Sequence, residues 1–214
     1  MSELASLHTA RLLLRRIVPA DLDHLYALDN DVEVMRYING GQPTPYAVVK
    51  EELLPVFLRR DARGAAYGFW AAQTQPEGRF VGWFSLRLVD RVGARAALGY
   101  RLCRSLWGCG YATEGARALI AYGFAERRLQ EVVATTYEEN RASRRVMEKV
   151  GMRYVRSVRL TSGDLARADT YHSRAVDVWD GYDVEYALTR SAWERQRIGP
   201  EHYDQTKTSS SSAE

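Results

Sequence analysis

Apolar positions in the first third of the chain switch between strand-like and helical spacing. The run RLLLRRI at residues 11–17 is apolar enough for a strand, and Pro19 then opens a predicted helix. The apolar side of that helix consists of Leu22, Leu25, Tyr26 and Leu28. A second helical pattern extends from Thr44, a good N-cap residue, to Gly64, and Pro55 is expected to kink or split it. The chain therefore begins with a strand followed by two helical regions.

The middle of the chain changes to short strand patterns. Residues 65–74, 80–89 and 96–103 each have the apolar content of a strand, and the segments between them are short and turn-rich. We therefore expect an antiparallel meander. Beyond it we predict a helix over 113–127, a strand over 131–137, a short helix from Asn140 to Gly151, and strands over 152–160 and 183–190. This order predicts an α+β fold with one mixed, mostly antiparallel central sheet flanked by helices.

The length of 214 residues favours a single domain. We expect a leader over residues 1–9, a domain over 10–190, and an extension over 191–214 that ends in a disordered serine-rich tail. Residues 161–182 are long for a loop in a compact domain, and such loops tend to be binding elements or disordered. A free edge strand near the C-terminus could pair two copies into a homodimer.

Charge and hydropathy exclude several kinds of partner. The formal net charge is only +3 and the basic residues are spread along the chain, so no nucleic-acid partner is expected. No apolar run approaches the length of a membrane span and the N-terminus does not resemble a secretory signal, so we expect a cytoplasmic protein with no membrane partner. The two cysteines, Cys103 and Cys109, match no metal-binding spacing, so no metal is expected.

Two glycines one residue apart, Gly108 and Gly110, stand between a predicted strand and a predicted helix in the segment SLWGCGYAT. Such a turn aims backbone N–H groups and the positive end of a helix dipole at one spot, which favours an anion. A tight turn without a ligand is the alternative. A P-loop is excluded because no lysine follows either glycine, and a dinucleotide fingerprint is excluded because Thr113 replaces its third glycine.

The segment SLWGCGYAT resembles the pyrophosphate-binding turn of the Gcn5-related N-acetyltransferase (GNAT) family, and the likeness extends over residues 10–189. The resemblance implies that acetyl-CoA is the cosubstrate and that its pyrophosphate contacts Trp107, Gly108, Cys109, Gly110, Tyr111, Ala112 and Thr113. Ser105 stands where the family usually has Gln or Arg. The segment NRASRRVMEKVGM resembles the family helix beside the pantetheine arm and thioester, which adds Asn140 and Ser143. The N-terminal run and the glycine turn are most similar to the RimJ/RimL branch.

The resemblance implies direct attack of a neutral amine on the acetyl thioester. Backbone N–H groups near Leu102 and Cys103 would bind the thioester carbonyl, and Ser143 would assist the leaving thiolate. Relatives often have a glutamate where this chain has Ala97, and a tyrosine where it has Met147. The base is therefore open: water relayed through Tyr100 is one candidate, and the acidic candidates are Glu138, Glu139 and Asp180. The predicted catalytic set is Ser143, Tyr100 and Glu138.

The acceptor pocket is expected between the early helices, the meander and the long loop. Its aromatic candidates are Tyr37, Trp70, Trp83 and Trp179, and further candidates are Arg36, Tyr171 and His172. The sequence favours an acetyl-CoA-dependent N-acetyltransferase acting on a primary amine of a small molecule or a peptide N-terminus. A non-catalytic acyl-CoA-binding protein is the alternative, because Ala97 and Met147 occupy positions where catalytic side chains are found in relatives.

Overall fold

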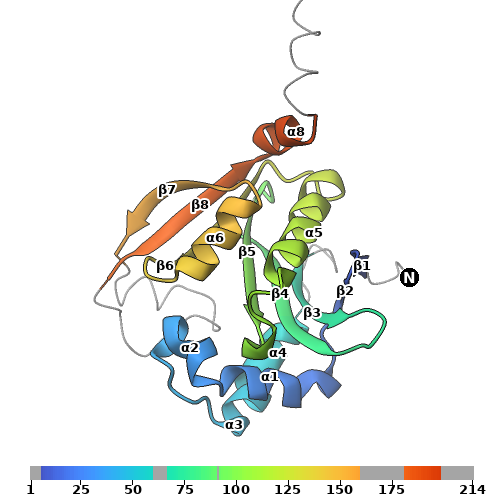
Figure 1. The fold of residues 1–214 in the computed structure, drawn as a ribbon, viewed down its shortest axis with the longest axis vertical. Coiled ribbons are helices and arrows are strands. Elements are labelled where there is room, and N and C mark those ends of the chain that lie inside the picture. The colour runs from blue at the N-terminus through green and yellow to red at the C-terminus, as the bar shows by residue number, and fades with distance from the viewer. Residues whose placement is uncertain (1–5, 60–66, 91, 160–180, 199–214) are drawn as a thin grey trace, which may run out of the picture.

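An eight-stranded sheet forms the centre of the protein in this computed structural model, which describes residues 6–59, 67–90, 92–159 and 181–198 (Figure 1). Its strands are β1 (Leu7–His8), β2 (Leu12–Arg16), β3 (Gly68–Thr74), β4 (Phe80–Leu88), β5 (Arg95–Leu102), β6 (Glu131–Tyr137), β7 (Arg153–Val158) and β8 (Asp183–Thr189). The spatial order is β1-β2-β3-β4-β5-β6-β8-β7. Every neighbouring pair is antiparallel except β5 and β6, which are parallel. The predicted mixed, mostly antiparallel sheet is confirmed.

Helices cover both faces of this sheet. They are α1 (Leu22–Asp29), α2 (Val32–Asn39), α3 (Tyr46–Val48), α4 (Leu54–Leu58), α5 (Tyr111–Ala125), α6 (Arg141–Lys149) and α8 (Arg190–Ile198), with short turns η1 (Pro19–Asp21), η2 (Val49–Leu53) and η3 (Arg104–Leu106). Buried residues of α5 and α6 join one hydrophobic cluster with the sheet, and those of α1, α2 and α4 join a second. The fold is therefore α+β with a core on each side of the sheet.

The helical region after Thr44 is shorter than predicted. It ends at Leu58, and a π-helical turn, η2, directly precedes α4, which carries Pro55 in its first turn. Proline cannot donate the backbone hydrogen bond that a continuous α-helix needs, so a wider turn before it is a physically reasonable break. Helix α2 was not predicted from the sequence. The carboxylate of Asp31 caps it by accepting from the N–H groups of Glu33 and Val34.

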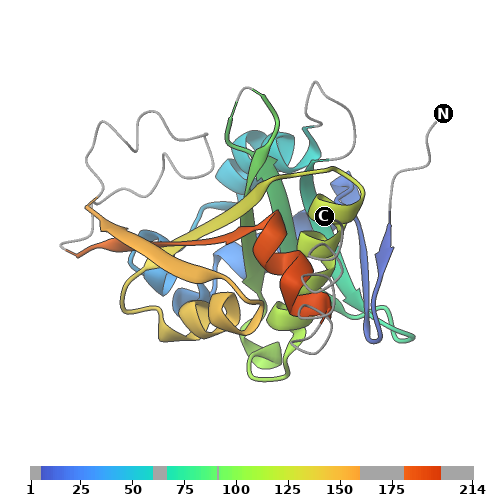
Figure 2. The ribbon, with the colours of Figure 1, turned by 90° about the horizontal axis from the view of Figure 1, so that it is seen from above.

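Parts of the predicted leader and of the predicted C-terminal extension belong to the folded domain. β1 lies within the predicted leader and pairs with β2, and α8 begins at the edge of the predicted extension. Figure 2 shows α8 beside α5, where the ring of Trp193 lies 5.2 Å from that of Phe124. The serine-rich tail lies outside the described residues. Within those described residues, no helix is both long enough and apolar enough to span a bilayer.

Candidate active site

The glycine turn connects β5 to α5 and presents an uncapped helix start. Gly108 and Gly110 have φ angles of 75° and 85°, a left-handed conformation that other residues rarely adopt. Gly110 is the N-cap of α5, and no side chain caps the helix there. A Cβ atom at Gly108 would have nothing within 4 Å. An exposed turn whose helix N–H groups lack a side-chain acceptor fits a phosphate well.

Two side chains hold the start of this turn. The indole Nε1–H of Trp107 donates to the carbonyl of Leu102 at 2.9 Å, which ties the turn to the end of β5. Ser105 is exposed, and its hydroxyl accepts a hydrogen bond from the Arg79 guanidinium at 3.1 Å. Arg79 therefore brings a positive charge beside the position where the family usually has Gln or Arg. Arg79 cannot be recognised from the sequence, because it lies in a hairpin turn 26 residues from Ser105 and belongs to no motif.

The parallel strands β5 and β6 pair along only part of their length. Their register ends at Ala97 of β5, so the remainder of β5 borders a gap toward β6. The Cys103 N–H donates to the Val81 carbonyl on β4 at 2.9 Å. Because N–H directions alternate along a strand, those of Tyr100 and Leu102 point toward the gap. The prediction for Leu102 therefore agrees with the ladder, whereas the predicted free N–H at Cys103 is wrong because β4 uses it.

Two predicted catalytic side chains meet at this gap. The hydroxyl of Tyr100 lies 2.9 Å from Ser143 Oγ and donates to the Ser143 carbonyl at 3.1 Å. Asn140 caps α6, with its Oδ1 accepting from the Ser143 N–H at 3.1 Å, so the cap fixes where Ser143 stands. Burial raises the pKa of Tyr100 to about 12, although its hydrogen bond with Ser143 opposes the rise. Tyr100 is therefore neutral at physiological pH and acts as a hydrogen-bond donor.

Glu138 has a structural task at the end of β6. Its Oε1 accepts from the Tyr182 N–H at 3.2 Å, and its own carbonyl accepts from the Arg144 guanidinium at 3.0 Å. The carboxylate is only half-buried, so a role as base stays a prediction. Met147, at the position where relatives have a tyrosine, is buried in the core. Within the described part of the chain, no three His, Cys, Asp or Glu side chains gather closely enough to hold a metal.

The four aromatic pocket candidates fall in different places. Tyr37 on α2 is half-exposed and stacks on Tyr137 of β6, with 6.0 Å between ring centroids. Trp70 and Trp83 are 0% and 4% exposed and belong to the two hydrophobic clusters. Large aromatic rings on central strands commonly pack into the core in this way, and a role for Trp70 and Trp83 in the pocket wall stays a prediction. Trp179 lies outside the described residues, as do Tyr171, His172 and Asp180.

Comparison with known proteins agrees with this geometry. The acetyltransferase (GNAT) domain family matches residues 11–153. The chain is 32% identical to the FsC-acetyl coenzyme A-N(2)-transacetylase of Aspergillus fumigatus, over 90% of this chain and 79% of that one. A GNAT-family acetyltransferase from Bacillus anthracis superposes with a TM-score of 0.70 at 23% identity, covering 87% of this chain and 99% of that chain. A RimL ribosomal L7/L12 alpha-N-protein acetyltransferase in complex with coenzyme A superposes with a TM-score of 0.68 at 18% identity, covering 88% and 99%. The chain belongs to the GNAT family and is an N-acetyltransferase.

Proposed function

We propose that this enzyme transfers the acetyl group of acetyl-CoA to a primary amine of a small molecule or a peptide N-terminus, with both substrates bound together. The observation that carries the proposal is the contact between Tyr100 and Ser143, 2.9 Å apart, beside the part of β5 that does not pair with β6 and that leads into the glycine turn. The anion site at the glycine turn and the hydroxyl groups of Tyr100 and Ser143 would then bind two ends of one elongated ligand. The predicted cytoplasmic location is part of the same proposal.

The residues present fit acetyl-CoA. The uncapped start of α5 and the turn at Gly108 and Gly110 would hold the pyrophosphate, with Arg79 adding charge beside Ser105. The Leu102 N–H, which points into the gap between β5 and β6, would bind the thioester carbonyl. When bound, acetyl-CoA supplies an activated acetyl group.

The side chains at the gap handle protons. Because Tyr100 donates to the Ser143 carbonyl, the Ser143 hydroxyl can orient its own proton either toward Tyr100 or into the gap. In the second orientation it stabilises a departing thiolate, and a thiol whose ordinary pKa is about 8.5 leaves with little protonation. An acceptor amine with a pKa of about 8 is partly neutral at pH 7 and needs only water as base. We therefore favour an α-amine or a weakly basic amine over a lysine side chain.

The acceptor would approach beside α2. Tyr37, Tyr137 and the guanidinium of Arg36, which lies 5.4 Å from the Tyr37 ring centroid, form an aromatic and cationic surface there. The name of the Aspergillus relative specifies transfer to an N(2) position, which supports a small-molecule amine. RimL is named as an alpha-N-protein acetyltransferase, so a peptide N-terminus stays within the proposal.

Thiol release from acetyl-CoA, followed with Ellman's reagent across a panel of peptides, aminoglycosides and polyamines, tests the proposal. Amine-stimulated release supports it and ranks the acceptor classes. Calorimetric titration with CoA is run in parallel on the same preparation. Tight CoA binding without release from any amine would instead favour the non-catalytic acyl-CoA-binding protein.

A further inference from the structure

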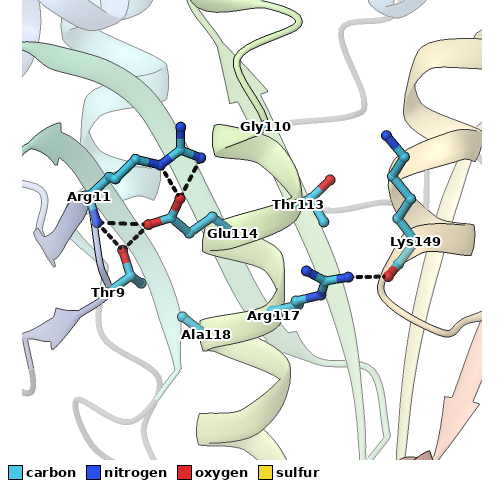
Figure 3. A pocket seen from close by; sticks show the side chains of 8 residues that line it. All are labelled: Thr9, Arg11, Gly110, Thr113, Glu114, Arg117, Ala118 and Lys149. Carbon is cyan, nitrogen blue, oxygen red and sulfur yellow. Dashed lines mark hydrogen bonds and ion pairs between the residues drawn. The ribbon is translucent and has the colours of Figure 1, made fainter.

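Arg11, just before β2, contacts three residues of the glycine turn and of the helix that follows it, and Figure 3 shows its contact with one of them, Glu114. Its Nη1 donates to the carbonyl of Cys109 at 3.0 Å. Its Nε and Nη2 lie 2.7 and 2.6 Å from Glu114 Oε2, in the first turn of α5. The guanidinium also lies 4.6 Å from the ring centroid of Tyr111. One side chain therefore links the N-terminal hairpin to the middle of the turn and to the helix start.

The contact with Cys109 controls a backbone donor. The carbonyl of Cys109 and the N–H of Gly110 belong to one planar trans peptide, so they point in opposite directions. A flip of this peptide rotates ψ of Cys109 and φ of Gly110, and glycine, which has no Cβ atom, places little steric restraint on φ. By holding the carbonyl, Arg11 directs the Gly110 N–H to the side of the turn away from itself. Without Arg11 the same peptide can present its carbonyl, which repels a phosphate.

Glu114 holds Arg11 in place. Its Oε1 accepts from the Thr9 hydroxyl at 2.6 Å and from the Arg11 backbone N–H at 2.9 Å, while Oε2 takes the guanidinium. Burial opposes ionisation of Glu114, but the hydrogen bonds from Thr9 and Arg11 outweigh it and lower its pKa. The carboxylate is thus charged and cancels the charge of Arg11. Simple attraction between Arg11 and a bound phosphate is correspondingly weak.

We propose that Arg11 is a positioning residue for acetyl-CoA: it holds the Cys109–Gly110 peptide so that the Gly110 N–H faces the pyrophosphate. Glu114 acts through Arg11 by anchoring the guanidinium. A Cβ atom at Gly110 would lie 3.3 Å from Arg11 Nη2, so glycine at this position also admits the close approach of the guanidinium. This inference rests on the proposed binding of acetyl-CoA at the turn.

The test compares CoA affinity by calorimetry in the wild type, Arg11→Met and Arg11→Met/Glu114→Gln. Methionine keeps the length of the side chain but cannot donate. Loss of a charge-assisted hydrogen bond that orients a ligand donor should weaken CoA binding about tenfold or more. The double variant restores the neutral local charge but not the donor to Cys109, so it should stay weak. Recovery of wild-type affinity in the double variant would show a purely electrostatic role and overturn the inference.

A second readout needs no cosubstrate. With glycine labelled by ¹⁵N, the amide resonance of Gly110 should move or broaden in Arg11→Met, because its peptide is no longer held. An unchanged Gly110 resonance with unchanged CoA affinity would overturn the proposal. If the wild type itself does not bind CoA, the proposed function fails along with this inference. If the wild type binds and Arg11→Met binds equally well, only the inference fails.

Arg156→Met provides the matched control. Arg156 is also an exposed arginine in an ion pair, 3.0 Å from Glu185, but it lies on β7 at the opposite edge of the sheet from β1. This variant should keep both the CoA affinity and the Gly110 resonance. A loss of CoA affinity equal to that of Arg11→Met would indicate general destabilisation instead of positioning, and would contradict the proposal.

Discussion

Helix α5 packs closely against the sheet at Gly115, and replacing this residue by alanine should destabilise the protein. A Cβ atom there would lie 2.3, 2.6 and 2.7 Å from three ring carbons of Phe84. Phe84 is fully buried, so its ring has no open space into which to move. Phe84 also packs 6.1 Å from the ring of Tyr100, and a displaced Phe84 would therefore disturb the candidate active site.

Two effects of opposite sign decide the outcome. Alanine in a helix interior is favoured over glycine by about 1 kcal/mol. Overpacking a filled core costs about 1–3 kcal/mol, and contacts this short belong at the upper end of that range. We therefore expect Gly115→Ala to lower the free energy of unfolding by about 1–2 kcal/mol. For a chain of this size, each kcal/mol corresponds to a fall in Tm of about 2–4 °C.

Urea unfolding followed by circular dichroism measures this change. Gly123→Ala is the matched control, because it makes the same substitution in the same helix but meets Leu129 Cδ1 at 2.8 Å, the end of a flexible side chain. Its loss of stability should be smaller. Phe84→Leu in the Gly115→Ala background should recover part of the loss by making room. A Gly115→Ala protein as stable as the wild type would refute the claim that α5 packs this tightly.

Three further predictions concern the turn, the hydroxyl pair and acid stability. Gly110→Asp should abolish CoA binding in calorimetry with a small change in Tm, because it adds a side chain at positive φ and a negative charge at the anion site. Tyr100→Phe and Ser143→Ala should each lower kcat about tenfold with little change in CoA affinity, and the double variant should lose little more because the two groups act together. With a pKa of about 12, Tyr100 should add no ionisation to the rate profile below about pH 10. Burial of Asp21 favours its neutral form, but the hydrogen bond from Arg15 helps to lower its pKa below the value in the unfolded chain. The ionised Asp21 therefore stabilises the fold above the unfolded pKa, and this stabilisation is lost as pH falls through the folded pKa. Asp21→Asn should flatten the acid side of a plot of unfolding free energy against pH.

Much of the fold was predictable because the apolar pattern carries it. The three-strand meander and the strand over 131–137 follow from local apolar content and turns, and the observed strands β3 to β6 agree closely with them. Helix α2 escaped prediction because its cap, Asp31, follows α1 after a single residue, which leaves no visible boundary in the pattern. The shortened helix before residue 60 reflects a π-turn beside Pro55, and sequence indicates only that some break occurs there.

The candidate site likewise has features that local sequence predicts and features that depend on tertiary contacts. The sequence by itself determined the glycine turn, because positive φ at Gly108 and Gly110 is a local requirement, and it determined the Asn140 cap that places Ser143. Local rules could not determine which distant side chains meet these elements.

Only the tertiary structure decided which distant side chains contact these elements. Packing of α6 beside β5 brings Tyr100 to Ser143 across 43 residues, and the N-terminal hairpin brings Arg11 to Glu114 across 103. Tertiary packing likewise placed Trp70 and Trp83 in the two hydrophobic clusters, because a strand residue faces a core or an open surface according to what covers its side of the sheet. Hydrophobic burial over the whole chain decides which helices cover each face of the sheet. This is a long-range property that no short segment of sequence contains.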